Sequence, residues 1–234
     1  MNKIDIIEEV ARLYGYDRIP EPPRSVVPNV TPRELPEDTL RRRARALLAG
    51  LGYRETYTNS MLPTRTATSF AAAFPSPDGG AVETLNPISQ EMASLRPSLL
   101  PGLLAAVSYN QARGAEALRV LELGHVYAQG EDPDAPVPGY VEHQSLILGL
   151  SGPAQSQGWD TPAREADVYD LKGALTHVLA ALGIRDVDEI ASTEPGALTA
   201  YRLFLDVGGR RLGVLGRVSD ALADAYDLQV PVYF

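Results

Sequence analysis

Segments that favour β-strands follow one another in adjacent pairs along most of this chain. They are rich in branched and aromatic residues and cover residues 53–61, 82–85, 118–127, 146–150 and 201–218. Gly208-Gly209 interrupts the last segment, and a two-residue glycine turn predicts a β-hairpin there. Because the strands are not each followed by a helix, the pattern favours an α+β fold with an antiparallel sheet over a doubly wound parallel sheet.

Helical periodicity predicts the remaining elements. In the first predicted helix, residues 4–14, the apolar side chains of Ile6, Val10 and Leu13 recur at helical spacing, and Gly15 provides a C-terminal cap. Further helices are predicted over residues 37–51, 99–112, 168–182 and 220–226.

A proline-rich stretch divides the chain. Residues 20–36 contain six prolines and show no periodicity, so they are predicted to be an extended linker. Residues 1–19 then form a short first unit, and residues 37–234 form the main domain.

Composition excludes several classes of protein. No apolar run approaches the roughly 20 residues of a membrane span, so no membrane contact is expected. The chain has no cysteine and no apolar signal-peptide core, which fits a cytoplasmic protein and excludes disulfides and thiolate metal sites. Its formal net charge of −9 works against broad binding to phosphate backbones.

Four sequence blocks occur in the order typical of one known family. Residues 5–20 read Asp-Ile-Ile-Glu-Glu-Val-Ala-Arg-Leu-Tyr-Gly-Tyr-Asp-Arg-Ile-Pro, and the other blocks are Leu85 to Leu104, Leu121 to Tyr127, and Tyr169 to Gly183. Together they resemble bacterial phenylalanyl-tRNA synthetase beta subunits over nearly the whole chain. The resemblance identifies residues 1–19 as the end of a small domain that precedes a core like the catalytic domain of class II aminoacyl-tRNA synthetases.

The resemblance implies a fold and a set of partners. The fold is a class II antiparallel sheet flanked by helices, preceded by the last helix of the small domain. The partner is a catalytic alpha subunit in an alpha2-beta2 tetramer, which uses ATP to attach phenylalanine to its tRNA. The helix of residues 40–51 would pack against that alpha subunit, although its apolar stripe is equally compatible with a plain core helix.

The chain is predicted to be inactive alone, with no catalytic and no cofactor-binding residues. Working class II enzymes use an arginine in the second motif to clamp the α-phosphate of ATP, and Ala128 stands at that position here. Arg217, in the region of the third motif, stands where the family usually has glutamate, so a role in ATP binding is not favoured. The histidines are scattered without the spacing of a catalytic or metal site: His125, His143 and His177.

Asp5, Glu8 and Glu9 are the candidate metal ligands. Their spacing places three carboxylates on one helical face, which by itself is typical of a solvated face balanced by Arg12. By resemblance these positions bind Mg²⁺, whose preferred ligands are oxygens, together with one further aspartate upstream of Met1. The chain alone is therefore expected to bind Mg²⁺ weakly or not at all.

Two other functions remain as alternatives. One is a regulatory, metabolite-binding paralogue that kept the class II fold without a ligase partner. The other is a nucleic-acid-binding module that uses an arginine stripe on the helix of residues 37–51, formed by Arg41, Arg42, Arg43 and Arg45.

Overall fold

The computed structural model describes residues 3–21, 35–73, 79–133, 135, 137–192, 194 and 196–234. The chain divides into two compact units, Met1–Leu35 and Pro36–Phe234. Most of the predicted linker lies outside the described residues. None of the helices within the described ranges is both long and apolar enough to cross a membrane.

Residues 3–21 and 35, the part of the first unit that the structure describes, contain one α-helix. Helix α1 (Lys3–Tyr14) is followed by the 3-10 turn η1 (Tyr16–Arg18), with Gly15 between them at a φ of 95°. This positive φ is readily adopted by glycine, so Gly15 ends the helix as predicted. The large apolar side chains of α1 are all exposed within this unit.

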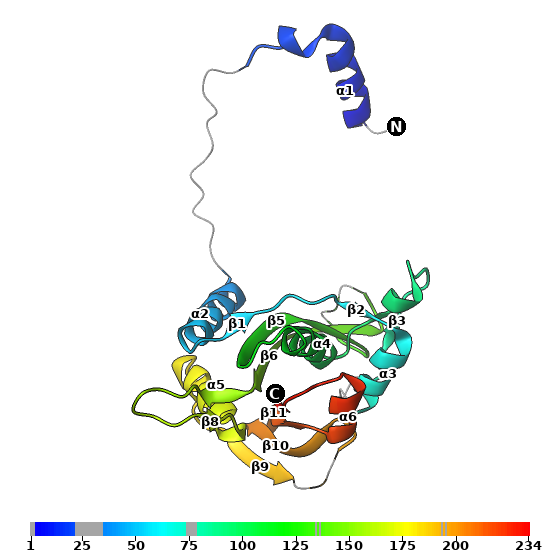
Figure 1. The fold of residues 1–234 in the computed structure, drawn as a ribbon. Coiled ribbons are helices and arrows are strands. Elements are labelled where there is room, and N and C mark those ends of the chain that lie inside the picture. Colours follow the sequence, from blue (N-terminus) through cyan, green and yellow to red (C-terminus); the bar gives the residue numbers. More distant parts are fainter. Residues whose placement is uncertain are drawn as a thin grey trace. The chain divides into compact units, whose positions relative to one another are not determined.

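The second unit is built on one large sheet (Figure 1). Among the described residues it has seven strands in the order β1-β5-β6-β12-β11-β10-β9. Their bounds are β1 Arg54–Glu55, β5 Leu118–Gln129, β6 Tyr140–Ser151, β9 Asp188–Ser192, β10 Thr199–Val207, β11 Arg210–Val218 and β12 Val232–Tyr233. Every pairing is antiparallel except that of β1 with β5, which is parallel.

Two hairpins dominate this sheet. Strands β5 and β6 pair continuously from Leu118–Ser151 to Gln129–Tyr140. Strands β10 and β11 meet at Gly208 and Gly209, whose φ angles are both positive, as the tight hairpin turn requires. The predicted antiparallel sheet and the predicted turn are therefore confirmed.

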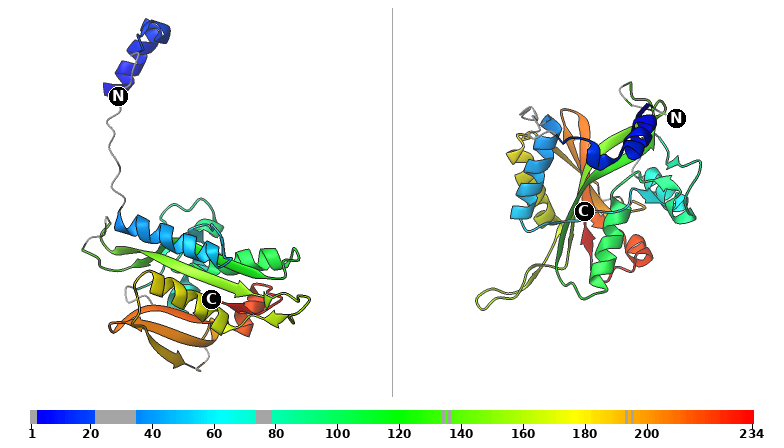
Figure 2. Two further views of the ribbon diagram at one scale, coloured as in Figure 1. Left: turned by 90° about the vertical axis from the view of Figure 1, so that its left-hand side faces the viewer. Right: turned by 90° about the horizontal axis from the view of Figure 1, so that it is seen from above.

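Helices cover both faces of the sheet (Figure 2). Helices α2 (Pro36–Gly50) and α5 (Val168–Ala181) pack on one face, with Leu48, Leu171 and Val178 in the buried cluster there. Helices α3 (Thr64–Ala73), α4 (Leu100–Gln111) and α6 (Asp220–Ala225) pack on the other. The smaller elements are β2 Met61–Leu62, β3 Val82–Glu83, η2 Gln90–Met92, β4 Ser94–Leu95, β7 Pro153–Gln155 and β8 Arg164–Glu165.

The prediction of one strand over residues 53–61 is wrong. The structure has two strands of two residues each, β1 and β2, separated by an irregular segment. Thr56 and Thr58 bond to the neighbouring strand β5, and the side chain of Asn59 accepts a hydrogen bond from the amide of Met61. The threonines hold this segment beside β5, and the local bond between Asn59 and Met61 competes with strand pairing before β2.

Candidate functional site

Two of the sequence blocks meet in a buried ion pair. Arg96, directly after β4, and Glu122, on β5, lie with Nη1 and Oε1 2.6 Å apart. Their side chains are only 8% and 1% exposed, respectively. A charged pair this deeply buried is tolerable only if its remaining polar atoms are also bonded.

The neighbouring backbone and Thr58 provide those bonds. Arg96 donates from Nε to the carbonyl oxygen of His125 at 2.8 Å and from Nη1 to that of Thr58 at 3.3 Å. The hydroxyl of Thr58 donates to Glu122 Oε2 at 2.7 Å. We call Thr58, Arg96 and Glu122 the Arg96 cluster; it links the segment after β1 to β4 and β5.

Glycines make room for the Arg96 cluster. A Cβ atom on Gly124 would overlap the guanidinium of Arg96, and a Cβ atom on Gly102, in the first turn of α4, would overlap the side chain of Thr58. These close approaches give a physical reason for glycine in the blocks Leu85 to Leu104 and Leu121 to Tyr127. They also leave the Arg96 guanidinium enclosed, so it is not available to clamp a phosphate.

Ala128 of strand β5 is the residue that the family resemblance aligns with the motif-two arginine of class II enzymes. It lies opposite Val141 of β6, and both residues are buried. A methyl group cannot offset the charge that gathers on an α-phosphate, so this alignment predicts that the strand supplies no cation there.

Arg217 on β11 is also engaged within the chain. Its Nη1 lies 3.1 Å from Asp220 Oδ1, in the first turn of α6. The pair connects the end of β11 to the start of the following helix. This arrangement gives Arg217 a local contact at the surface of the unit, since the Asp220 side chain is 84% exposed.

A polar chain that was not predicted runs across β5 and β6. Arg41 on α2 donates to Gln144 at 2.7 Å, the Gln144 amide lies 3.2 Å from His125 Nε2, and His125 Nδ1 lies 3.7 Å from Glu142. Burial first, and then the Glu142 carboxylate, raise the pKa of Tyr127. His125 is paired with Gln144, and Tyr127 with Glu142, in the β5–β6 hairpin. A prediction of the strand register of residues 118–151 would therefore have placed these side chains together.

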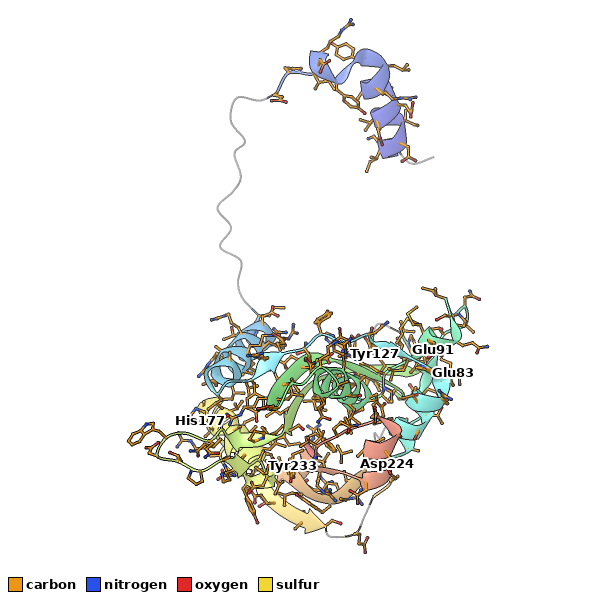
Figure 3. The ribbon with its side chains drawn as sticks, viewed as in Figure 1. Glu83, Glu91, Tyr127, His177, Asp224 and Tyr233 are labelled. Carbon is orange, nitrogen blue, oxygen red and sulfur yellow. The ribbon has the colours of Figure 1, made fainter. Side chains whose placement is uncertain are left out.

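The polar chain borders a cavity of about 580 Å³ between the β5–β6 hairpin and the segment that contains β3. His177 is on α5, away from Tyr127; both residues are labelled in Figure 3. The described histidines thus do not assemble into one site, and His125 lacks a neighbouring serine, threonine or cysteine nucleophile among the contacts of the described chain.

The structure places Asp5, Glu8 and Glu9 on α1, and all three are exposed. The Glu9 carboxylate is paired with the Arg12 guanidinium. Within the described residues, no group of three or more histidine, cysteine, aspartate or glutamate side chains is arranged to hold a metal ion. These three carboxylates therefore do not form a complete metal site by themselves.

Most of the apolar side chains of helix α2 pack within the second unit. Ala44 and Leu48 are buried, whereas Leu40 is 47% exposed. The arginines of this helix make contacts within the chain: Arg41 bonds Asp38, Arg43 bonds the carbonyl oxygen of Ala181, and Arg45 bonds Glu55.

Known proteins provide an independent test of the resemblance. The family model for the phenylalanyl tRNA synthetase beta chain CLM domain matches residues 22–234. The phenylalanine--tRNA ligase beta subunit of Salinibacter ruber is 50% identical over 98% of this chain, and that of Chlorobium chlorochromatii is 34% identical over 99%. The match covers 28% of each relative, so the chain spans less than a third of their length.

Solved structures support the fold. A pyrrolysyl-tRNA synthetase from Desulfitobacterium hafniense superposes with a TM-score of 0.60 over 83% of this chain and 61% of its own, at 17% sequence identity. At that identity the likeness concerns the fold alone, and it confirms the predicted class II synthetase-like architecture. The chain therefore belongs to the phenylalanyl-tRNA synthetase beta-chain family, and residues 22–234 are its CLM domain, a catalytic-like domain.

Proposed function

We propose that this chain is an inactive catalytic-like core that scaffolds the catalytic alpha subunit of phenylalanine–tRNA ligase. In the assembled enzyme, an alpha2-beta2 tetramer in the cytoplasm, the alpha subunit activates phenylalanine with ATP and transfers it to its tRNA. The beta core contributes structure to that reaction and no chemical group.

The observation that carries this proposal is the buried alanine at the motif-two position. Ala128 offers no positive charge. Arg119 on the same strand bonds the carbonyl oxygens of Leu51 and Ala154, Arg96 is paired with Glu122, and Arg217 with Asp220. A site that stabilises developing phosphate charge requires a preorganised cation, which these residues do not supply.

The surface proposed for the alpha subunit is the N-terminal half of α2. Leu40 is the exposed member of a stripe whose other members are packed inside the unit, so it can extend the apolar core into an interface. Ile190 on the edge strand β9 is a matched control, because it is 50% exposed, close to the 47% of Leu40.

The test is co-purification with the alpha subunit of the same organism, followed by phenylalanine-dependent ATP–pyrophosphate exchange. We expect the chain to bind the alpha subunit and to show no exchange alone. Leu40→Asp should weaken binding by about fivefold or more, as expected for loss of an interface anchor worth over 1 kcal/mol, while Ile190→Asp should not. Exchange by the chain alone would refute the inactive core, and equal binding of both variants would refute the α2 surface.

We also propose that Asp5, Glu8 and Glu9 contribute to a Mg²⁺ site that needs a further oxygen ligand from elsewhere in a longer subunit. Three exposed carboxylates on one helix suit a hard cation but leave most of its coordination to other groups. Calorimetric titration of this chain with Mg²⁺ should therefore detect no micromolar site. A micromolar site that survives in a variant with all three carboxylates changed to amides would place the ion elsewhere.

The regulatory paralogue is not favoured, because the 50% and 34% identical relatives are named as ligase subunits. The nucleic-acid-binding alternative loses support because Arg41, Arg43 and Arg45 bond acceptors within the chain. Salt-dependent binding of tRNA by the isolated chain would restore it.

A further inference from the structure

The face of α5 that lies toward the end of α2 carries small residues between polar ones. Four residues at helical spacing share this face: Asp170, Gly173, Ala174 and His177, the last labelled in Figure 3. A Cβ atom added to Gly173 would meet nothing within 4 Å. Because the middle of this face is small, a cavity of about 370 Å³ lies between α5, the residues that follow α2, and the paired strands β5 and β6. We call it the Tyr53 cavity.

Tyr53 contributes a hydroxyl without a hydrogen-bond partner to this cavity. The residue lines the cavity and is only 6% exposed, yet in the part of the chain that the structure describes nothing bonds its hydroxyl. A buried hydroxyl left unbonded costs free energy, so such groups normally bind protein, water or a ligand. Burial raises the pKa of Tyr53 to about 12, so the hydroxyl keeps its proton at neutral pH and can donate a hydrogen bond.

Arg119 on β5 contributes a cation to the same cavity. Two of its N–H groups donate to backbone carbonyl oxygens, at 3.3 and 2.8 Å, and among the described residues it forms no ion pair with a carboxylate. The carboxylate that lines the cavity, Asp170, is bonded through both oxygens to Arg164. Arg119 and Asp170 act on the pKa of Tyr53 in opposite directions, so the hydroxyl lies near both groups. A guanidinium has five N–H donors, which leaves Arg119 with donors for a ligand.

These donors and the walls of the cavity indicate the class of ligand. A guanidinium binds a carboxylate through two parallel hydrogen bonds, and the Tyr53 hydroxyl can add a third. Leu51 and Leu150 provide an apolar wall. The volume lies in the range of small-molecule sites and exceeds the space that one acidic side chain fills. We propose that the Tyr53 cavity binds a small carboxylic acid with an apolar body, and that Arg119 and Tyr53 hold its carboxylate.

The Tyr53 cavity is distinct from the position aligned with the motif-two arginine. Arg119 lies near the start of β5, whereas Ala128 lies near its end. The cavity is also formed without the N-terminal half of α2, the surface proposed for the alpha subunit. Binding of an acid here is therefore independent of the scaffold role.

An NMR-monitored titration of the isotope-labelled chain with sodium benzoate tests the proposal. Benzoate joins a carboxylate to a compact apolar ring, and benzamide is an uncharged control of the same shape. Benzoate should shift the amide signals of Tyr53, Arg119 and residues 169–177 saturably, with a Kd on the order of 1 mM, as expected for a ligand of this size. Benzamide should bind about tenfold more weakly or less, because it has no charge to pair with the guanidinium.

Two variants locate the ligand. Tyr53→Phe removes only a hydroxyl that has no partner in the described chain, so it should fold normally and bind benzoate about tenfold more weakly. Gly173→Leu places a side chain in the open space of the cavity and should abolish binding without a clash. Thr176→Leu is its matched control and should bind benzoate like the parent, because Thr176 is exposed on the same helix and does not line the cavity.

Equal binding of benzoate and benzamide would overturn the proposal, as would the lack of saturable shifts or binding that survives in both Tyr53→Phe and Gly173→Leu. A carboxylate side chain of a partner has the same chemistry as a free acid. Saturation-transfer NMR, observed on benzoate in the complex with the alpha subunit, distinguishes these sources. Benzoate should still bind in the complex; loss of its binding there would assign the Tyr53 cavity to the partner and overturn a free ligand.

Discussion

Removing one partner of the Arg96–Glu122 pair should destabilise the chain more than removing both. In Arg96→Met the Glu122 carboxylate, 1% exposed in the parent, keeps Thr58 as a donor but loses its cationic partner at 2.6 Å. The carbonyl oxygen of His125 loses its bond from Arg96 as well. Breaking a buried pair in this way typically costs about 3–5 kcal/mol in the free energy of unfolding.

The double variant Arg96→Met/Glu122→Met shows how much of the loss in stability comes from leaving one buried charge unpaired, and how much from losing the ion pair itself. With apolar side chains of similar length at both positions, no buried charge remains, and such replacements are often neutral or stabilising. The double variant should therefore be more stable than Arg96→Met. A double-mutant cycle should give a coupling energy of about 2 kcal/mol or more, within the range found for residues in contact.

Urea denaturation followed by circular dichroism provides all four free energies of unfolding in one set of experiments. Arg45→Met is the matched control, because its bond to Glu55 joins side chains that are 41% and 38% exposed. Exposed pairs contribute less than about 1 kcal/mol. If Arg96→Met costs no more than Arg45→Met, or if the two single changes simply add, the Arg96 cluster is not the buried network described above.

Three further predictions concern single substitutions. Gly124→Ala should cost about 1–3 kcal/mol by overpacking and much less in the Arg96→Met background; an equal cost in both would exclude the guanidinium contact as the cause. Of two helical glycines, Gly102→Ala should destabilise, whereas Gly173→Ala, where a Cβ atom meets nothing within 4 Å, should stabilise by about 0.5–1 kcal/mol in thermal melts. Asp170→Asn should lower stability near neutral pH by about 1 kcal/mol, because Asp170 closes a capping box. The hydrogen bond from Arg164 holds the pKa of the Asp170 carboxyl below its ordinary value. The stabilisation by Asp170 is therefore present above about pH 4 and is lost as the pH falls through the folded pKa. A stability difference between the parent and Asp170→Asn that stays constant down to pH 2 would contradict this.

The elements with strong local signals could be predicted from the sequence. The β10–β11 hairpin follows from Gly208-Gly209, and α5 follows from its periodicity. Helix α3 was missed because its alanine- and threonine-rich sequence has no clear apolar stripe, although Phe70 within it is buried. Strand β6 begins at Tyr140, six residues before the predicted start, because the consecutive polar, exposed residues Glu142, His143 and Gln144 hide the strand pattern.

The candidate site was less accessible to sequence reasoning. The blocks that contain Arg96 and Glu122 indicated the family, but nothing in their spacing indicates that these two side chains bond each other, because they lie on different elements. Their contact depends on how the segment after β1 packs beside β5. The prediction for Ala128 is different, because it depends on one position within a regular strand, β5.

The parallel pairing of β1 with β5 has a consequence for synthesis on the ribosome. Arg54 pairs with Val120, and the helix before β1 packs against α5, which ends at Ala181. A growing chain makes α2 and β1 first, and at roughly 5–20 residues per second they wait on the order of ten seconds for these partners. During that interval the residues that bury the apolar face of α2 around Leu48 have not yet been synthesised. This face is therefore exposed on the nascent chain, where chaperones or other chains can bind it. The order of elements along the gene thus makes the earliest helix of this unit the one most exposed to misassembly before folding.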